Sequence, residues 1–173
     1  AGELYKNKEF LHDERDNGAV FLGICGGYQL FGHYYQPFDG DKLLGISLMD
    51  AYTVAGKKRF IGNVTVETDF LTPPTLVGFE NHSGLTYLQG DTKPLGKVVV
   101  GNGNNGQDKT AGARFKNVFG TYLHGSLLPK NPHFADYLIS LALEKRYGEK
   151  IELSKLDDKL EVMTHNSLVG KAY

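Results

Sequence analysis

The sequence has a single cysteine and no long hydrophobic run, and both absences exclude whole classes of protein. One cysteine among 173 residues cannot form an internal disulfide, so a secreted domain stapled by disulfides is excluded. No apolar stretch approaches the roughly 18 residues that a membrane helix needs. Residues 1–6 also lack the apolar run of a signal peptide. We therefore expect a cytoplasmic protein without membrane insertion.

The chain is also without a strong charge of either sign. Its 19 Lys and Arg residues against 20 Asp and Glu residues give a formal net charge of -1, which argues against a nucleic-acid binder that relies on bulk positive charge. A phosphate-binding loop of the form Gly-x-x-x-x-Gly-Lys-Ser/Thr does not occur. One cysteine and scattered histidines give no metal cluster of the usual zinc spacing. The sequence therefore predicts no metal, no cofactor in this chain and no nucleic-acid partner.

Length and pattern indicate one α/β domain. A chain of this size can bury its own core, and no repeat, linker or low-complexity tract divides it. An apolar run typical of a buried parallel strand lies between helical patterns, so we expect a mostly parallel central sheet flanked by helices. The predicted helices are 3–17, 28–35 and 129–146, and the predicted strands are 19–24, 62–68, 75–79, 97–100 and one or two within 114–123.

The most informative segment is Gly-Ile-Cys-Gly-Gly-Tyr-Gln at 23–29. An apolar strand leads into a turn of small residues with Cys25 at its apex and a helix behind it, the geometry that presents a nucleophile on a strained turn. Glycines before and after the apex relieve the crowding that a Cβ would cause. The helix N-terminus stabilises a thiolate, and the backbone N–H of Gly26 can donate to an oxyanion. The alternative is a small buried cysteine, but the flanking glycines favour a nucleophile.

A catalytic thiol needs a base, and two histidines follow predicted strands. His82 lies in Phe-Glu-Asn-His-Ser-Gly at 79–84, and His124 lies in Gly-Thr-Tyr-Leu-His-Gly at 120–125. In an α/β sheet, residues at strand ends face the edge where sites are built. The pattern favours His124 but does not by itself exclude His82.

These motifs resemble a known family. Segment 23–29 is similar to the nucleophile elbow of class I glutamine amidotransferases of the Cys–His type, and segment 120–125 resembles the cobyric-acid-synthase-like branch. Within that branch, segments 78–84 and 124–132 look most like the glutaminase subunit, the GatD type, of lipid II isoglutaminyl synthase. The resemblance covers about residues 18–147. It implies a class I glutamine-amidotransferase-like (flavodoxin-like) α/β fold, with the site at the carboxyl ends of strands.

The resemblance carries roles onto matching positions. Cys25 would attack the side-chain amide of L-glutamine, and His124 would activate the thiol and then protonate the departing ammonia. Gly26 would supply one N–H of the oxyanion hole, and Gln29 would line the substrate pocket. Arg59 would hold the α-carboxylate of glutamine, because a planar guanidinium binds a carboxylate through two parallel hydrogen bonds. Without the resemblance, its basic neighbourhood would be interpreted as a solvated loop.

Two features depart from the family pattern. Ser126 stands two positions after His124, where many members carry an acidic residue, so the carboxylate that orients the imidazole must come from elsewhere. Glu80 is one candidate, and a partner subunit that the resemblance implies is the source that we favour. His82 is then a structural or pocket-lining residue. Family members also have strand–helix units before the elbow, one of which donates the second oxyanion N–H. We therefore expect residues 1–173 to form a single glutamine amidotransferase domain, truncated at its N-terminus.

The resemblance implies a glutaminase subunit that releases glutamate and ammonia from L-glutamine through a thioester on Cys25. A Mur-ligase-like synthetase partner of the MurT type, holding ATP and Mg²⁺, would use the ammonia to amidate D-glutamate of lipid II in peptidoglycan synthesis. One alternative is the glutaminase domain of a cobyric-acid-type synthase. Alternatives from other classes are a catalytically inactive scaffold subunit, against which the intact Cys25 and His124 argue, and an unrelated cysteine hydrolase on a similar sheet.

Overall fold

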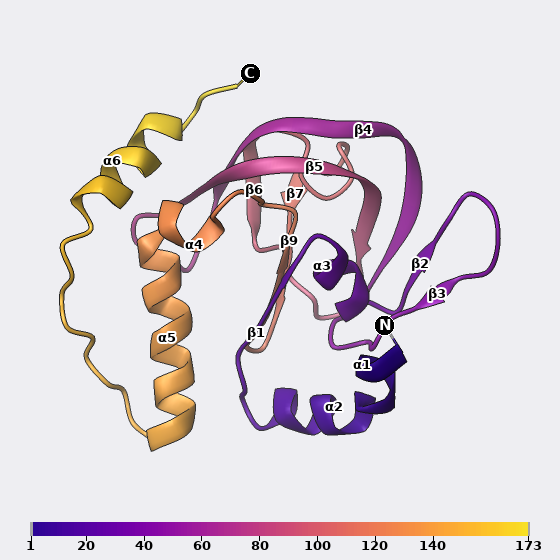
Figure 1. Cartoon of the computed structure of the whole chain (residues 1–173), viewed down its shortest axis with the longest axis horizontal. Helices are drawn as coiled ribbons and strands as arrows, with labels where there is room; N and C mark the ends of the chain where they lie inside the picture. Colours follow the sequence, from indigo (N-terminus) through magenta and orange to yellow (C-terminus); the bar gives the residue numbers. More distant parts are fainter. Residues whose placement is uncertain (1, 173) are drawn as a thin grey trace.

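Residues 2–172 are described by a computed structural model, in which two β-sheets have helices along one side and at one end (Figure 1). The helices are α1 (Gly2–Lys6), α2 (Lys8–Asp16), α3 (Gly26–Phe31), α4 (Leu127–Lys130), α5 (Pro132–Tyr147) and α6 (Lys159–Leu168). Helices α4, α5 and α6 lie along the side, and α1 and α2 lie at the end. The strands are β1 (Phe21–Ile24), β2 (Tyr34–Gln36), β3 (Leu43–Leu44), β4 (Ala51–Glu67), β5 (Thr75–Leu88), β6 (Gly96–Val100), β7 (Thr110–Ala111), β8 (Ala113–Phe115) and β9 (Val118–Thr121). None of the helices in this part of the chain combines the length and apolar character that crossing a bilayer requires.

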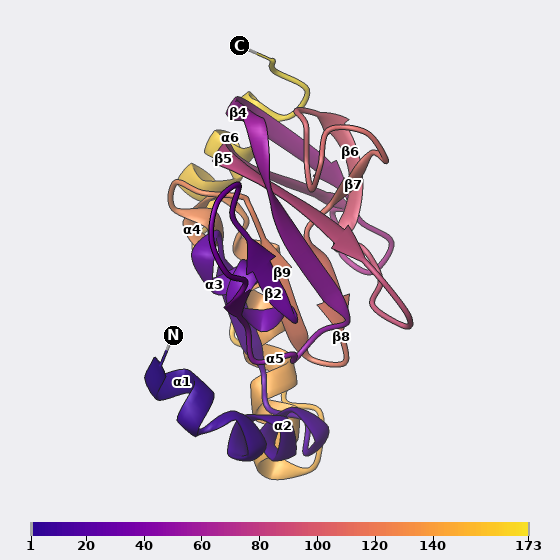
Figure 2. The ribbon, with the colours of Figure 1, turned by 90° about the vertical axis from the view of Figure 1, so that its right-hand side faces the viewer.

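Both sheets mix strand directions. The smaller sheet has the order β1-β9-β8, in which β1 and β9 run parallel while β8 and β9 run antiparallel. The larger sheet has the order β3-β2-β4-β6-β7, with β5 paired to β4, and its β2–β4 pairing is parallel while its other pairings are antiparallel. The long β4–β5 pair curves across the molecule, with α4 and α6 against β5 on one side and β6 and β7 on the other (Figure 2).

The α/β class is therefore confirmed, but the expectation of a mostly parallel sheet is wrong. The reason is the length of the connections between neighbouring strands. Residues 68–74 join β4 to β5, and residues 116–117 join β8 to β9. Such short connections permit antiparallel pairing alone, because a parallel return needs a crossover of about a dozen residues or more. The parallel pair of β1 and β9 has the whole intervening chain, including α3 and the larger sheet, as its crossover.

The predicted helices are present, with changed bounds. The helix expected over 3–17 is divided into α1 and α2, and the helix expected over 129–146 corresponds to α4 and α5. Pro132 stands in the first turn of α5, and Gly148 ends that helix with φ 75, the left-handed conformation that glycine tolerates best. The helix expected over 28–35 ends at Phe31, because the next residues leave it to form β2 and pair with β4. Helix α6 had no clear signal in the sequence.

Strands β4 and β5 extend well beyond the predicted segments 62–68 and 75–79. Glycines within these strands lower the strand signal, yet close neighbours require some of them. A Cβ at Gly56 would lie 2.5 Å from the Ser83 carbonyl oxygen, and a Cβ at Gly78 would lie 2.9 Å from the Cβ of Leu123. These glycines therefore mark close approaches between segments rather than turns.

Two apolar clusters hold the layers together. One packs α5 against β4, β5 and β9, and it includes Phe119 and Phe134, whose ring centroids are 5.8 Å apart in an edge-on contact. The other surrounds α3 and includes Tyr28, Leu48 and Met49, and Cys25 packs against it. Burying one such large side chain stabilises the fold by about 1.5–3 kcal/mol, so these clusters fix the strand end and helix that carry Cys25.

Candidate active site

The predicted turn around Cys25 is present between β1 and α3. Cys25 has φ 54 and ψ -109, a backbone conformation that a non-glycine residue adopts only under constraint. Its N–H donates to the Thr121 carbonyl at 2.9 Å, and its own carbonyl accepts from the Gln29 N–H at 3.0 Å. The half-buried Cys25 is thus held between the end of β1 and the first turn of α3.

The glycines around Cys25 have different roles. A Cβ at Gly23 would lie 2.6 Å from the Phe31 ring, so the predicted relief of crowding is confirmed there. It is wrong for Gly26 and Gly27, because a Cβ at either position would meet nothing within 4 Å beyond its chain neighbours and its own helix. Gly26 is exposed and lines a cavity, so the first turn of α3 is open to a ligand at this residue.

The register of β1 and β9 brings the Cys25 turn near the His124 turn. Ile24 lies opposite Thr121 in a parallel pair, so Cys25 and the residues after Thr121 leave the sheet at the same edge. His124 is fixed there by two backbone hydrogen bonds with Phe79, at 2.8 and 3.2 Å. The side chain is half-buried, and burial lowers the pKa of His124 below its ordinary value of 6.5. The imidazole is therefore neutral at neutral pH, which is the form that a general base requires.

Gln29, on the same helix as the turn, joins a network of hydroxyl groups. Its Nε2 donates to the Tyr122 hydroxyl at 3.1 Å, and that hydroxyl lies 2.7 Å from the Thr86 hydroxyl. Burial, together with the charge of Cys25, raises the pKa of Tyr122. The phenol therefore stays protonated and lies within electrostatic reach of the thiol. Gln29 also lines a cavity of about 350 Å³ with Gly26, Leu30, Tyr35, Leu43, Leu44 and Gly45.

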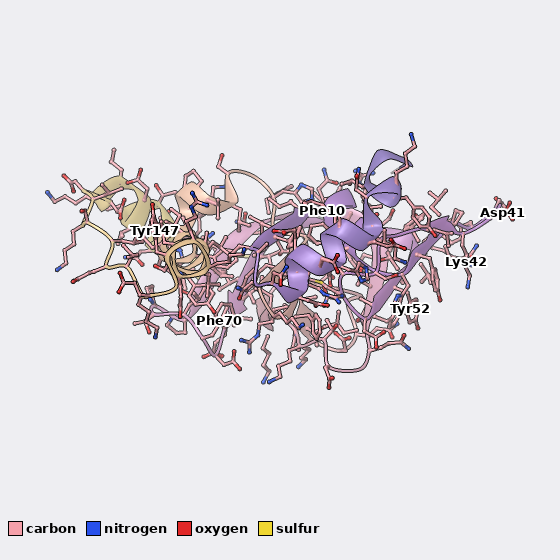
Figure 3. The ribbon with its side chains drawn as sticks, turned by 90° about the horizontal axis from the view of Figure 1, so that it is seen from below. Phe10, Asp41, Lys42, Tyr52, Phe70 and Tyr147 are labelled. Atoms are coloured by element: carbon pink, nitrogen blue, oxygen red, sulfur yellow. The ribbon has the colours of Figure 1, made fainter. Side chains whose placement is uncertain are left out.

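The cavity is bounded on its outer side by the hairpin of β2 and β3. This hairpin extends from the molecule, with Asp41 and Lys42 at its outer end and Tyr147, at the end of α5, on the opposite side (Figure 3). The Nζ of Lys42 lies 3.9 Å from the ring centroid of Tyr34, which stacks on Tyr52 at 5.4 Å. These contacts hold the hairpin against the rest of the larger sheet.

Arg59 and His82 lie together on the β4–β5 pair. Arg59 is exposed in an irregular stretch of β4 between Ala55 and Phe60, and its Nε donates to the Asn81 side-chain oxygen at 2.7 Å. The pKa of His82 is lowered to about 4, mainly by burial and to a smaller extent by the nearby charges of His124 and Arg59. His82 therefore lies close enough to both Arg59 and His124 to be affected by their charges. Cys25, Arg59 and His124 are not among the residues that line the cavity beside Gln29, whereas Gly26 is.

Two residues that the sequence left open, His82 and Glu80, have structural roles, in agreement with the interpretation of His82 as a structural or pocket-lining residue. His82 stacks flat on Tyr122, with ring centroids 3.6 Å apart and an angle of 3° between the planes, so it is a packing partner of the hydroxyl network. Glu80 is almost fully buried and accepts from the backbone N–H groups of Asn102 at 2.9 Å and Gly103 at 3.1 Å. Within residues 2–172 no hydrogen bond joins Glu80 to His124, so Glu80 fastens the loop after β6 instead of orienting the base.

Tyr122 is the site residue that the sequence interpretation missed. It was part of the Gly-Thr-Tyr-Leu-His-Gly motif, where its position two residues before His124 was the available signal. Among the described residues, no group of three or more His, Cys, Asp and Glu side chains is placed to hold a metal ion. The arrangement provides a thiol on a strained turn, an open N–H beside it, a neutral imidazole at the same sheet edge and a cavity lined by Gln29. These are the parts that acyl transfer to a cysteine needs.

Comparison with known proteins gives consistent similarities. Residues 3–132 match the model of the CobB/CobQ-like glutamine amidotransferase domain. The chain is 42% identical over 161 residues to "Lipid II isoglutaminyl synthase (glutamine-hydrolyzing) subunit GatD" of Streptococcus pneumoniae, covering 92% of this chain and 62% of that protein. The corresponding Staphylococcus aureus subunit is 42% identical over 170 residues, with 98% and 68% covered. A probable cobyric acid synthase of Methanococcus maripaludis is 36% identical over 148 residues, with 79% and 29% covered. The chain thus spans about two thirds of the length of the first two relatives.

Proposed function

The chain belongs to the family of CobB/CobQ-like glutamine amidotransferase domains, and we propose that it is the glutaminase part of a lipid II isoglutaminyl synthase. The observation that carries the proposal is the strained turn of Cys25 at the sheet edge that it shares with His124. The two relatives that are 42% identical, both called subunit GatD of that synthase, support the assignment. The proposed reaction is hydrolysis of L-glutamine to glutamate and ammonia.

The first half of the reaction forms a thioester. His124 takes the proton of the Cys25 thiol, and the sulfur attacks the carbonyl carbon of the glutamine side chain. The carbonyl oxygen becomes an oxyanion that accepts from the N–H of Gly26, which lies open to a ligand. When the oxyanion collapses, the C–N bond breaks and the imidazolium returns its proton to the departing nitrogen, so ammonia leaves. One such oxyanion donor typically contributes about 100- to 1000-fold to the rate.

The second half of the reaction hydrolyses the thioester. His124 is neutral again after ammonia leaves, so it can take a proton from water while the water oxygen attacks the thioester carbonyl. The C–S bond then breaks, the thiolate of Cys25 is protonated by the imidazolium, and glutamate is released. The lowered pKa of His124 favours the neutral form that both attacks need.

Substrate binding is divided between two regions in this proposal. The cavity of about 350 Å³ beside Gln29 accepts the glutamine side chain next to the Cys25 turn. Arg59 holds the α-carboxylate through its guanidinium, which is exposed and fixed at one nitrogen by Asn81. The two terminal nitrogens of the guanidinium, Nη1 and Nη2, are then left to bind the carboxylate. Lysine cannot provide this two-point contact.

We also propose a Mur-ligase-like synthetase partner of the MurT type, which binds ATP and Mg²⁺ in the cytoplasm and consumes the ammonia. The Nε2 of His124 is buried and has no hydrogen-bond partner within residues 2–172. Ser126 is exposed, and the hydrogen bonds of Glu80 go to the loop after β6. Within residues 2–172 no carboxylate is hydrogen-bonded to His124, so we propose that the partner supplies the orienting carboxylate at the exposed part of the ring, which restricts ammonia release to the assembled enzyme.

The test of the glutaminase assignment is covalent labelling. The chain, co-expressed with the synthetase partner, is incubated with 6-diazo-5-oxo-L-norleucine, an electrophilic analogue of glutamine, and digested for mass spectrometry. We expect one adduct on Cys25, prevented by excess L-glutamine and absent from Cys25→Ser. A wild-type complex that hydrolyses no glutamine and forms no adduct would overturn the glutaminase assignment in favour of a scaffold subunit.

The related cobyric acid synthase suggests a second acceptor for the ammonia. The sequence identities favour the first proposed acceptor, lipid II. Identity is 42% with the GatD subunits and 36% with the probable cobyric acid synthase, of which the alignment covers 29%. Incubation of the complex with ATP, glutamine and lipid II should convert the α-carboxylate of D-glutamate to an amide. Amidation of a corrinoid carboxylate instead would assign the chain to the alternative.

A further inference from the structure

The hydroxyl group of Tyr122 accepts a hydrogen bond from the side-chain amide of Gln29. The Nε2 of Gln29 donates to the phenolic oxygen at 3.1 Å. Because this oxygen accepts there, its own hydrogen is available for the Thr86 hydroxyl at 2.7 Å, which in turn lies 2.8 Å from the Thr53 hydroxyl. The simplest proton arrangement therefore runs from Tyr122 to Thr86 to Thr53, and it leaves Tyr122 as an acceptor toward Gln29.

Close packing holds the buried hydroxyl groups of this network in place. Tyr122 is 3% exposed, and its ring is held flat against His82. Gly84, on β5, lies so close that a Cβ there would be 2.5 Å from the Nε2 of Gln29 and 3.0 Å from the Tyr122 hydroxyl. Thr53 and Thr86 are also buried. A buried chain of hydrogen bonds with this little free space keeps a single orientation.

The fixed nitrogen determines which atom of Gln29 is left for a ligand. An amide has its NH₂ group and its carbonyl oxygen at opposite corners, so holding Nε2 on Tyr122 directs Oε1 away from the phenol. Within residues 2–172 no group donates a hydrogen bond to this Oε1, and Gln29 lines the cavity together with Gly26, the residue after Cys25. The cavity is thus presented with a hydrogen-bond acceptor.

An acceptor at this position distinguishes the substrate from the product of the proposed reaction. The side chain of glutamine ends in an NH₂ group that can donate to the carbonyl of Gln29. The side chain of glutamate ends in a carboxylate, which has no hydrogen to donate and is repelled by another oxygen. A reversed Gln29 amide would present NH₂ and favour the carboxylate instead.

Resting on the proposed glutaminase function, we propose that Tyr122 is a positioning residue that fixes the Gln29 amide with its carbonyl toward the cavity. Tyr122 thereby makes the site select the amide of glutamine over the carboxylate of glutamate. Tyr122 does not touch the substrate in this scheme. It acts through Gln29, and Thr86 acts through Tyr122 by accepting a hydrogen bond from its hydroxyl group.

The variant Tyr122→Phe in the complex with the synthetase tests this proposal. Without the hydroxyl, the Gln29 amide is free to reverse, so we expect KM for glutamine to rise about tenfold, while kcat per labelled active site stays within about threefold. The inhibition constant of glutamate should fall, so that its ratio to KM for glutamine drops at least tenfold. An unchanged ratio would overturn the proposal, as would a loss confined to kcat.

A second variant and a matched control separate positioning from structure. In Thr86→Val the proton of Tyr122 loses its acceptor and turns toward Gln29, so the same ratio should fall although the phenol remains. Tyr28→Phe also removes a buried tyrosine hydroxyl, which donates to the Asn104 side-chain oxygen at 3.1 Å and does not touch Gln29. It should lose comparable stability and keep the ratio. A fall of equal size in Tyr28→Phe would show that the effect is one of general destabilisation and overturn the proposal.

Glutaramate tests which nitrogen of the substrate is recognised, because it keeps the side-chain amide and lacks the α-ammonium group. Its inhibition constant should rise in Tyr122→Phe by the same factor as KM for glutamine. If glutaramate binding is unchanged, Gln29 recognises the α-ammonium and the proposal is wrong. A wild-type complex without glutaminase activity would instead contradict the proposed function itself, so the two failures are distinguishable.

Discussion

Replacing Gly84 by alanine adds one methyl group at the most crowded point beside the candidate site. Its Cβ would lie 2.5 Å from the Nε2 of Gln29, 2.9 Å from the Cγ2 of Thr53 and 3.0 Å from the Tyr122 hydroxyl oxygen. The Gln29 side chain can move away, but the buried Thr53 and Tyr122 can do so only with their strands. Inserting a methyl group into a well-packed interior costs about 1–3 kcal/mol, so we expect a loss of that size in the free energy of unfolding.

The loss is measured by urea denaturation and by thermal melting of the purified protein. A chain of this length loses about 2–4 °C of melting temperature for each kcal/mol. Gly27→Ala is the matched control, because its added Cβ meets nothing within 4 Å outside its own helix and chain neighbours. Alanine there should leave stability unchanged or raise it by up to about 1 kcal/mol, since glycine is a poor helix former. If Gly84→Ala is as stable as the wild type, or if Gly27→Ala loses as much, the close packing around Tyr122 is refuted.

Three further predictions follow from the site. Arg59→Lys should raise KM for glutamine about tenfold without a change in melting temperature, because lysine loses the two-point contact of an exposed side chain; unchanged turnover at low glutamine would refute the carboxylate role. Burial lowers the pKa of His82 to about 4, against 6.5 for a free histidine, so the unfolded chain binds the proton first as the pH falls. The corresponding stability is complete above pH 6.5 and decreases by about 3 kcal/mol towards pH 4, and denaturation curves of His82→Gln should lack this decrease. Finally, the chain alone should hydrolyse glutamine at least tenfold more slowly than the complex with its synthetase; equal rates would exclude a carboxylate supplied by the partner.

The local sequence was sufficient for features that neighbouring residues build together. The turn at Cys25 follows from an apolar strand, small residues and a helix that are contiguous in the chain, and the structure has that turn, with φ 54. The limits of α5 follow in the same way from Pro132 and Gly148. In each case the controlling forces are steric and act over a few residues, so the pattern contains the information.

Other features were decided by packing between distant segments. The contact of Gln29 with Tyr122 joins residues 93 positions apart, and the neutral His82 results from burial that no local pattern indicates. Gly84 lies beyond the predicted strand 75–79, whereas the structure has it within β5, beside a crowded hydroxyl network.

By itself, then, the sequence determined which residue stands at the apex of the turn and which class of chemistry its neighbours suit. The tertiary structure alone decided strand direction, the orientation of the Gln29 amide and the engagement of Glu80 with the loop after β6. The physical reason is that hydrophobic burial and strand register determine which distant groups meet. Periodicity and motif spacing indicate the secondary structure of a segment, but they do not indicate which distant segment it pairs or packs with.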